Sequence, residues 1–255
     1  MSSIDIEKVK ILVVGDSGVG KSSLVHLICH GQPILNTSYT IGASLDVKIH
    51  EYKEGTPSQK TCFVEFWDIG GSVNHANSRH IFYASLNGII LVHDLTNRKS
   101  HTNLGKWLSE ILQRDQNIGS ERHRTSVSEY DPEQFAGHHT PILVVGVKRD
   151  QLDSQRQTKL QSSSIAEECG ADEINLNCTD AKHLAPGTTN AVKLSRFFDK
   201  VISRRSGHST RDGPKKYSFE VIERRYFPRD TSQTTSTQER RRISTSQYMK
   251  TLHTD

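Results

Sequence analysis

A glycine-rich stretch near the amino end has residue types and spacing suited to binding phosphate. Residues 15–22 read Gly-Asp-Ser-Gly-Val-Gly-Lys-Ser, which fits the pattern G-x-x-x-x-G-K-[ST]. Backbone N–H groups can wrap a phosphate chain, Lys21 supplies positive charge, and the Ser22 hydroxyl can ligate Mg²⁺. A chance glycine turn is the alternative, but a predicted strand before the stretch and a predicted helix after it favour phosphate binding. The expected contacts are Gly15, Asp16, Ser17, Gly18, Val19, Gly20, Lys21, Ser22 and Ser23.

A second candidate is the carboxylate in Asp68-Ile-Gly-Gly71, which follows the apolar run FVEFW. A carboxylate that leaves a strand near such a loop can hold a Mg²⁺-bound water, and the N–H of Gly71 can reach a γ-phosphate. Taken alone, a capping aspartate before a glycine turn is the simpler interpretation. The position of Asp68 after the glycine-rich stretch favours the metal site instead.

The third candidate is Lys148-Arg-Asp150, which Val147 separates from the apolar run ILVVG. The carboxylate of Asp150 can accept hydrogen bonds from both N1–H and N2–H₂ of guanine, which adenine cannot offer. The stem of Lys148 can lie along the base. On this tripeptide alone, a surface charge cluster at a strand end is the simpler interpretation.

Alternating strand and helix patterns predict an α/β fold with a mostly parallel sheet. Short apolar runs predict strands at 9–14, 45–52, 61–67, 88–93, 142–146 and 174–178. Helical spacing predicts helices near 21–30, 100–113, 156–168 and 190–202. Residues 1–205 form the predicted domain, interrupted by a long polar connection at 114–140.

The basic, Ser/Thr-rich tail at 206–255 is predicted to be disordered. Three interpretations remain open for it: a solvated tail, phosphorylation of the Arg-Arg-Ile-Ser segment at 241–244, or contact with anionic lipid. VISRR at 201–205 nearly repeats as VIERR at 221–225, so residues 203–222 read as an insertion or as a gene-model artefact.

Composition excludes several classes of protein. The 255 residues carry a net charge of +4, and the positive excess lies in residues 203–255, so we expect no nucleic-acid partner. The four cysteines contain no C-x-x-C pair, which argues against a zinc site or a disulfide framework. No signal peptide or membrane helix is predicted, and no cysteine follows Cys178, so we expect no lipid anchor and a cytoplasmic location.

The order of these motifs resembles the Ras superfamily of small GTPases, and within it the Rab-like members. The resemblance covers about residues 8–205 and implies a six-stranded sheet flanked by helices with a GTP/GDP–Mg²⁺ site. By position, Thr40 resembles the switch threonine that ligates Mg²⁺ beside Ser22 and Asp68. The catalytic centre implied comprises Lys21, Thr40, Gly71 and Ser72. Asn177, Cys178 and Thr179 fall where the family contacts the guanine carbonyl.

Two departures from the family bear on function. Ser72 replaces the glutamine that orients the attacking water, and serine is too short to do so in the same way. Val147 replaces the asparagine before Lys-x-Asp and cannot form its bracing hydrogen bonds. We therefore predict a nucleotide-dependent switch with slow hydrolysis. A pseudo-GTPase adaptor that keeps GTP as a structural ligand is the alternative, and a P-loop ATPase is more distant. The resemblance also implies a homodimer and a role toward other, prenylated small GTPases.

Overall fold

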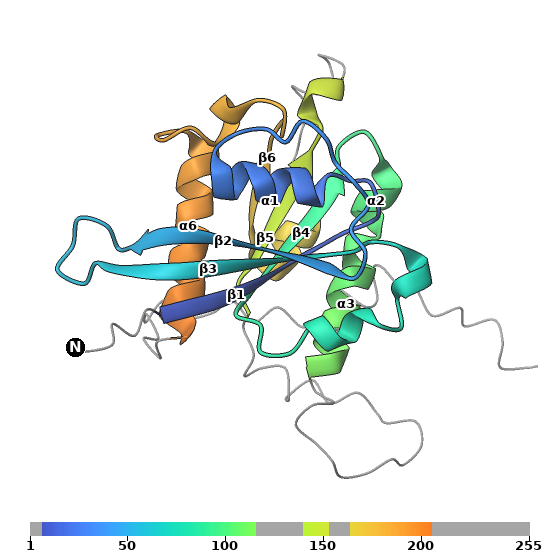
Figure 1. The fold of residues 1–255 in the computed structure, drawn as a ribbon, viewed down its shortest axis with the longest axis horizontal. Coiled ribbons are helices and arrows are strands. Elements are labelled where there is room, and N and C mark those ends of the chain that lie inside the picture. The colour runs from blue at the N-terminus through green and yellow to red at the C-terminus, as the bar shows by residue number, and fades with distance from the viewer. Residues whose placement is uncertain (1–6, 116–139, 153–163, 206–255) are drawn as a thin grey trace, which may run out of the picture.

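The computed structural model describes residues 7–115, 140–152 and 164–205. In this part of the chain six strands form one sheet in the order β2-β3-β1-β4-β5-β6 (Figure 1). β2 is antiparallel to β3, and the other neighbouring strands are parallel. The strands are β1 (Glu7–Val14), β2 (Ala43–Tyr52), β3 (Lys60–Ile69), β4 (Gly88–Asp94), β5 (Ile142–Val147) and β6 (Asp172–Asn175). The predicted α/β fold with a mostly parallel six-stranded sheet is confirmed.

Helices cover both faces of the sheet. Two buried clusters separate the layers: one packs α1 and α6 on the sheet, and the other packs α3 and α5 on the opposite face. The helices are α1 (Lys21–His30), α2 (Arg98–Thr102), α3 (Leu104–Asp115), α5 (Ser164–Cys169) and α6 (Thr189–Arg205). Short 3₁₀ turns are η1 (Val73–His75), η2 (Arg79–Phe82), η4 (Arg149–Gln151) and η5 (Ala181–Leu184). No described helix has the length and apolar character needed to cross a membrane.

The central strands are apolar along their length because helices bury both of their sides. In β1, Ile11 and Val13 face the layer of α1 and α6, whereas Leu12 and Val14 face α3. Every residue of β4 is buried. This packing holds the carboxyl ends of the strands in fixed positions, where the candidate site residues lie.

Most predicted boundaries lie within three residues of the observed ones, and two of the differences have a structural cause. The predicted helix at 100–113 is divided into α2 and α3 at Asn103. The side chain of Asn103 reaches Asp16 in the glycine-rich stretch at residues 15–22, called the phosphate-binding loop below. The last strand ends at Asn175 rather than at residue 178, because Asn177 forms a turn by accepting the Thr179 N–H at 2.8 Å. The alternation of apolar residues continues past the end of the sheet.

Several predictions fall on residues outside the described ranges. These are the larger part of the 114–140 connection, the start of the helix predicted at 156–168, and the tail at 206–255. Residues 203–205 continue α6, and the rest of the 203–222 segment lies outside the described part.

Candidate guanine-nucleotide site

The predicted site residues meet at one edge of the sheet. The phosphate-binding loop follows β1, Asp68 lies near the end of β3, and Lys148 follows β5. Because these strands are parallel, their carboxyl ends share one edge, which is where α/β proteins bind ligands. The topology therefore brings together residues more than 100 positions apart in the sequence.

The phosphate-binding loop has a backbone that only glycine accommodates well. Gly15 has φ of +151°, and a Cβ there would lie 2.1 Å from the carbonyl oxygen of Val92. Gly20 is the N-cap of α1 in a left-handed conformation and offers no capping side chain. The first N–H groups of α1 and the positive end of its dipole therefore face the loop, where an anion is stabilised.

Lys21 is a buried cation at this loop. Its side chain is 6% exposed, and Nζ donates to the carbonyl oxygens of Gly15 and Asp16, each at 3.0 Å. Burial lowers the pKa of Lys21, and the nearby charges of Asp68 and Asp16 oppose that effect. A phosphate bound in the loop would stabilise the protonated ammonium further.

Three side-chain oxygens meet beside the loop. Ser22 Oγ donates to Asp68 Oδ2 at 2.5 Å and lies 3.0 Å from Thr40 Oγ1, which donates to the same carboxylate oxygen at 3.2 Å. Asp68 is 1% exposed, and burial raises its pKa, opposed by the Ser22 hydrogen bond and the Lys21 charge.

The same cluster fits Mg²⁺. The second carboxylate oxygen of Asp68, Oδ1, is buried and has no hydrogen-bond partner among the described residues. Hydroxyl and carboxylate oxygens are the ligands that Mg²⁺ prefers, with phosphate and water completing its shell. Within the described ranges, no group of three or more His, Cys, Asp or Glu side chains could hold a metal ion. Ser22, Thr40 and Asp68, the three residues predicted from the sequence, are brought together in this cluster, and their binding of Mg²⁺ stays a prediction.

The loop after β3 lies directly on the phosphate-binding loop. A Cβ at Gly71 would be 2.5 Å from the backbone nitrogen of Ser17, so no larger residue fits there without a shift. The preceding Gly70 donates its N–H to the carbonyl of Gly42 at 2.8 Å, which links this loop to the segment after Thr40. Gly71 therefore lies against the phosphate-binding loop with Ser72 next to it, and Thr40 lies in the segment linked to them; the catalytic role predicted for these residues stays a prediction.

The segment after β5 contacts the phosphate-binding loop as well. Lys148 Nζ donates to the Gly18 carbonyl at 3.0 Å and to Asp94 Oδ2 at 2.7 Å. Although burial opposes the effect, hydrogen bonds from Lys148 and Thr96 hold the pKa of Asp94 below its ordinary value. Val147 is fully buried, and its Cγ2 would lie 3.5 Å from a Cβ at Gly20. Val147 thus supports the loop through apolar contact.

The residues predicted to bind the base lie on two adjoining turns. Asp150 is exposed in η4, and the Arg149 N–H donates to the Leu176 carbonyl at 3.3 Å. Burial, followed by the nearby charge of Asp150, raises the pKa of Cys178 to about 12. The charge of Asp150 therefore acts on the Cys178 thiol, and the guanine contact of these residues stays a prediction.

The other residues predicted to contact the nucleotide lie beneath the phosphate-binding loop, in α1 or in the second turn. Val19 is buried in the core cluster beneath the loop, and Ser23 lies in the first turn of α1. Asn177 accepts hydrogen bonds from both the N–H and the hydroxyl of Thr179 at 2.8 Å, which closes the second turn.

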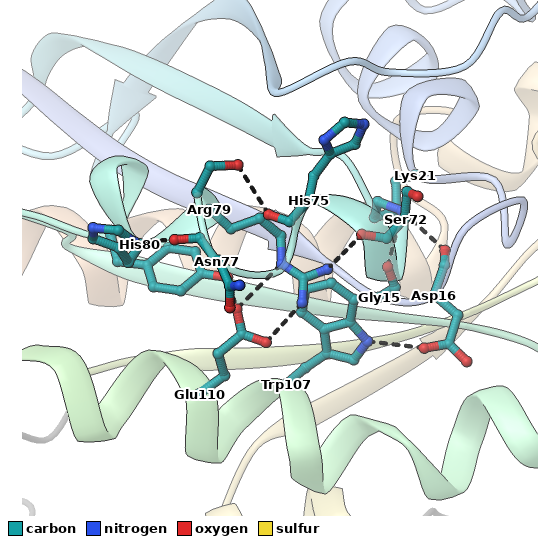
Figure 2. Close-up of polar contacts among 12 residues, drawn as sticks. Gly15, Asp16, Lys21, Ser72, His75, Asn77, Arg79, His80, Trp107 and Glu110 are labelled. Atoms are coloured by element: carbon teal, nitrogen blue, oxygen red, sulfur yellow. Dashed lines mark hydrogen bonds and ion pairs between the residues drawn. The ribbon is translucent and has the colours of Figure 1, made fainter.

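Sequence reasoning missed a second group of residues at the site. Asp94 ends β4, and a carboxylate at the end of a buried strand was a signal that could have identified it. Arg79, Trp107 and Glu110 form a polar network with Ser72 and the phosphate-binding loop (Figure 2). No motif marks these three residues, since they meet only through the packing of α3 and η2.

An apolar groove of about 530 Å³ lies elsewhere, between α1, β2, η5 and α6. Its lining includes the apolar side chains of Leu27, Leu194 and Phe198 and the basic residues Lys48 and Lys182. It contains none of the predicted nucleotide contacts. The nucleotide site is therefore assigned from the chemistry at the strand ends and not from the size of this groove.

The fold, the phosphate-binding loop and the order of motifs around it define a Ras-type small GTPase domain. Residues 10–120 match the family described as "Ras of Complex, Roc, domain of DAPkinase". The chain is 47% identical to Rab-like protein 3 of Bos taurus over 261 aligned positions, which cover 100% of both chains. It is 52% identical to Rab-like protein 3 of Mus musculus over 80% of this chain and 88% of that one. The small GTPase LIP1 of Arabidopsis thaliana is 31% identical over 86% of this chain and 63% of its own length. The chain belongs to the Rab-like protein 3 family.

Proposed function

We propose that this protein is a guanine-nucleotide-dependent switch that binds GTP or GDP with Mg²⁺ and hydrolyses GTP slowly. The observation that carries the proposal is the oxygen cluster of Ser22, Thr40 and Asp68 beside the phosphate-binding loop. Membership of a Rab-like small GTPase family supports the same class of ligand. Lys148-Arg-Asp150 at the adjoining strand end favours guanine over adenine.

Each group has a role that follows from its position. The backbone N–H groups of residues 15–20 and the Lys21 ammonium would bind the phosphates. Ser22 and Thr40 would ligate Mg²⁺, and Asp68 would hold one of its waters. When bound, Mg²⁺ neutralises charge that develops on the phosphate oxygens. Asp150 would accept both donors of the guanine edge.

The switch would act through the two loops that meet at the phosphates. Thr40 is hydrogen-bonded to Asp68, and Gly71 packs against the phosphate-binding loop. These contacts support the proposal that a γ-phosphate orders both segments, so that GTP and GDP would present different surfaces there. Ser72 follows Gly71 at the position where a water-orienting side chain is needed, and its hydroxyl reaches less far than an amide. Slow hydrolysis follows from that difference in length.

A second candidate function is an adaptor that holds one nucleotide as a structural ligand. Ser72 favours it, and so does Val147, whose buried apolar side chain stands where a polar brace would be needed. The two functions differ in turnover. Single-turnover phosphate release from the GTP-loaded protein gives a measurable rate for the switch and none for the adaptor.

Both candidate functions require a bound guanine nucleotide. Extraction of nucleotide from freshly purified protein, followed by chromatography, tests this requirement. We expect about one guanine nucleotide per chain. Recovery of adenine nucleotides, or of no nucleotide together with no binding of added fluorescent GDP, would overturn the proposal.

Three finer features remain predictions: a homodimer, a cytoplasmic location, and a role toward other, prenylated small GTPases. Light scattering on the purified full chain measures the first. Cell fractionation measures the second. Co-purification with prenylated and unprenylated forms of a small GTPase measures the third, since only the prenylated form should be retained.

A further inference from the structure

A ring of contacts joins the two loops of the proposed phosphate site through helix α3, which carries none of the site residues predicted from the sequence (Figure 2). We propose that Arg79 and Trp107 form a latch: Arg79 positions the loop at Gly71-Ser72, and Trp107 positions the phosphate-binding loop at Asp16. This inference rests on the proposed nucleotide function. It identifies what holds the γ-phosphate side of the site in place.

The first half of the latch holds the side chain of Asp16. Trp107 Nε1 donates to Asp16 Oδ1 at 2.9 Å, and Asn103 Nδ2 donates to Asp16 Oδ2 at 2.7 Å. Both carboxylate oxygens are therefore turned toward α3. A free carboxylate in an anion-binding loop would repel phosphate, so this orientation matters for binding. The carbonyl of Asp16 in turn accepts from Lys21 Nζ, which links α3 to the phosphate-binding ammonium.

The second half holds the guanidinium of Arg79. Nε and NH2 donate to the two oxygens of Glu110 at 3.2 and 2.8 Å, a two-pronged pairing that fixes the plane of the group. Tyr83 donates its hydroxyl to Glu110 Oε1 at 2.7 Å. Arg79 is 5% exposed, so solvent does not compete strongly for its donors.

Arg79 connects these two halves. Its guanidinium carbon lies 4.2 Å from the centre of the Trp107 ring, in cation–π contact. Its third nitrogen, NH1, donates to the carbonyl of Ser72 at 3.3 Å. The ring of contacts then closes because Gly71, next to Ser72, packs against the backbone of Ser17.

The two halves should affect the two nucleotides differently. The loop at Gly71 lies where it would meet the γ-phosphate, which GDP lacks, so Arg79 should slow the release of GTP alone. The phosphate-binding loop at Asp16 would meet the phosphates of both nucleotides, so Trp107 should slow the release of GDP and GTP alike. If Arg79 had a merely structural role, its replacement would change stability without changing the ratio of the two dissociation rates.

The test of the Arg79 half is the Arg79→Met variant of the full chain, which keeps an apolar stem and removes every donor. Dissociation of fluorescent GDP and of a fluorescent non-hydrolysable GTP analogue is followed after adding excess unlabelled nucleotide. We expect release of the GTP analogue to be about tenfold faster, the effect of losing one charged hydrogen bond, and release of GDP to change by less than about twofold.

A milder pair of variants keeps the test decisive if Arg79→Met does not fold. Tyr83→Phe removes one hydrogen bond to Glu110, and its expected effect is in the same direction but about threefold. Tyr52→Phe is the matched control, because it removes a tyrosine hydrogen bond to Ser203 on α6, and it should leave both rates unchanged.

The Trp107 half has its own matched pair, since the chain contains two tryptophans. Trp107→Phe removes the indole donor to Asp16 and should speed the release of both nucleotides about fivefold. Trp67→Phe removes an indole N–H that has no partner among the described residues, and it should leave both rates unchanged.

Two results for Arg79→Met would overturn the Arg79 half of the latch: equal acceleration of both nucleotides, or a lower melting temperature with an unchanged ratio of rates. If Tyr83→Phe speeds release of the GTP analogue no more than Tyr52→Phe does, the Arg79 half of the latch is likewise overturned. Release rates in Trp107→Phe no faster than those in Trp67→Phe would overturn the Trp107 half. Failure of the wild-type chain to bind either nucleotide would instead overturn the proposed function. The two failures are therefore distinguishable.

Discussion

The hydroxyl of Ser22 lies 2.5 Å from Asp68 Oδ2, so the first residue after the phosphate-binding lysine is hydrogen-bonded to the end of the neighbouring strand. The contact spans 46 positions in the sequence. It places two oxygen ligands suited to Mg²⁺ beside an anion-binding loop. Because Thr40 joins the same carboxylate oxygen, the segment before β2 is tied to this point as well.

The first prediction concerns the metal. In the wild-type chain, chelating Mg²⁺ with EDTA should speed the release of fluorescent GDP at least about tenfold, because one bound cation links protein and phosphate. In Asp68→Asn, release should already be fast, and EDTA should add less than about twofold.

Asp46→Asn is the matched control for this experiment. Asp46 lies on β2, 3.6 Å from His30, and is outside the oxygen cluster of Ser22, Thr40 and Asp68. It should retain the full EDTA effect. An equal response of wild-type and Asp68→Asn to the chelator would contradict the assignment of Asp68.

The second prediction concerns the base. Asp150→Asn should weaken GDP binding by about 100-fold or more, since the two guanine donors lose their common acceptor. Xanthine nucleotides present a carbonyl where guanine has its amino group, so the amide of the variant should favour them. Competition against fluorescent GDP by GTP, XTP and ATP measures the change.

The matched control for Asp150→Asn is Asp172→Asn, which removes a carboxylate that pairs with Lys200 on the surface. It should bind GDP like the wild-type chain. Equal displacement of fluorescent GDP by ATP and by GTP from the wild-type chain would show that Asp150 does not select the base.

The fold could be predicted from the sequence because its signals are local, and the phosphate site stays a prediction that rests on a signal of the same kind. The strands at 88–93 and 142–146 are continuous apolar runs, and the glycine-rich stretch joins a strand to a helix. The end of the last strand was placed wrongly, since Leu176 and Cys178 are buried beyond the sheet and extend its alternating pattern. Burial alone does not distinguish a strand from a packed turn.

The network around Arg79 could not be predicted from the sequence. Arg79 and Glu110 are 31 positions apart, and each is an ordinary charged residue in its own segment. Their pairing depends on how η2 packs across α3. The role of Asn103 could not be predicted for a related reason. The sequence pattern is helical on both sides of Asn103, but the helix is interrupted there, and the Asn103 side chain donates to Asp16.

The third prediction concerns acid stability. His93 is 4% exposed, and both of its ring nitrogens lack hydrogen-bond partners among the described residues. Burial, and then the neighbouring His101, lower the pKa of His93 from 6.5 to about 4. Between these values the unfolded chain binds a proton that the folded chain excludes. Stability that is present above pH 6.5 is therefore lost as the pH falls toward 4, by about 3 kcal/mol in total.

Urea unfolding at pH 7, 6 and 5 measures this loss. His93→Gln removes the titrating group, so its free energy of unfolding should fall less between pH 7 and pH 5 than that of the wild-type chain. His75→Gln changes an exposed histidine and should keep the wild-type slope. Identical pH dependence in the wild-type chain and His93→Gln would show that His93 is not the responsible group.

The last prediction concerns turnover. Ser72 follows Gly71 where a glutamine would orient the attacking water, so single-turnover hydrolysis should be no faster than that of an unassisted small GTPase, about 10⁻⁴ s⁻¹. The Arg79 contact holds the backbone carbonyl of Ser72 and does not depend on its side chain. Ser72→Gln should therefore raise the rate of phosphate release without changing GTP affinity.

Ser72→Ala is the matched control and should leave the rate low. A wild-type rate well above 10⁻⁴ s⁻¹ would contradict slow hydrolysis. If Ser72→Gln has no effect, side-chain length is not the only defect, and the adaptor function gains support.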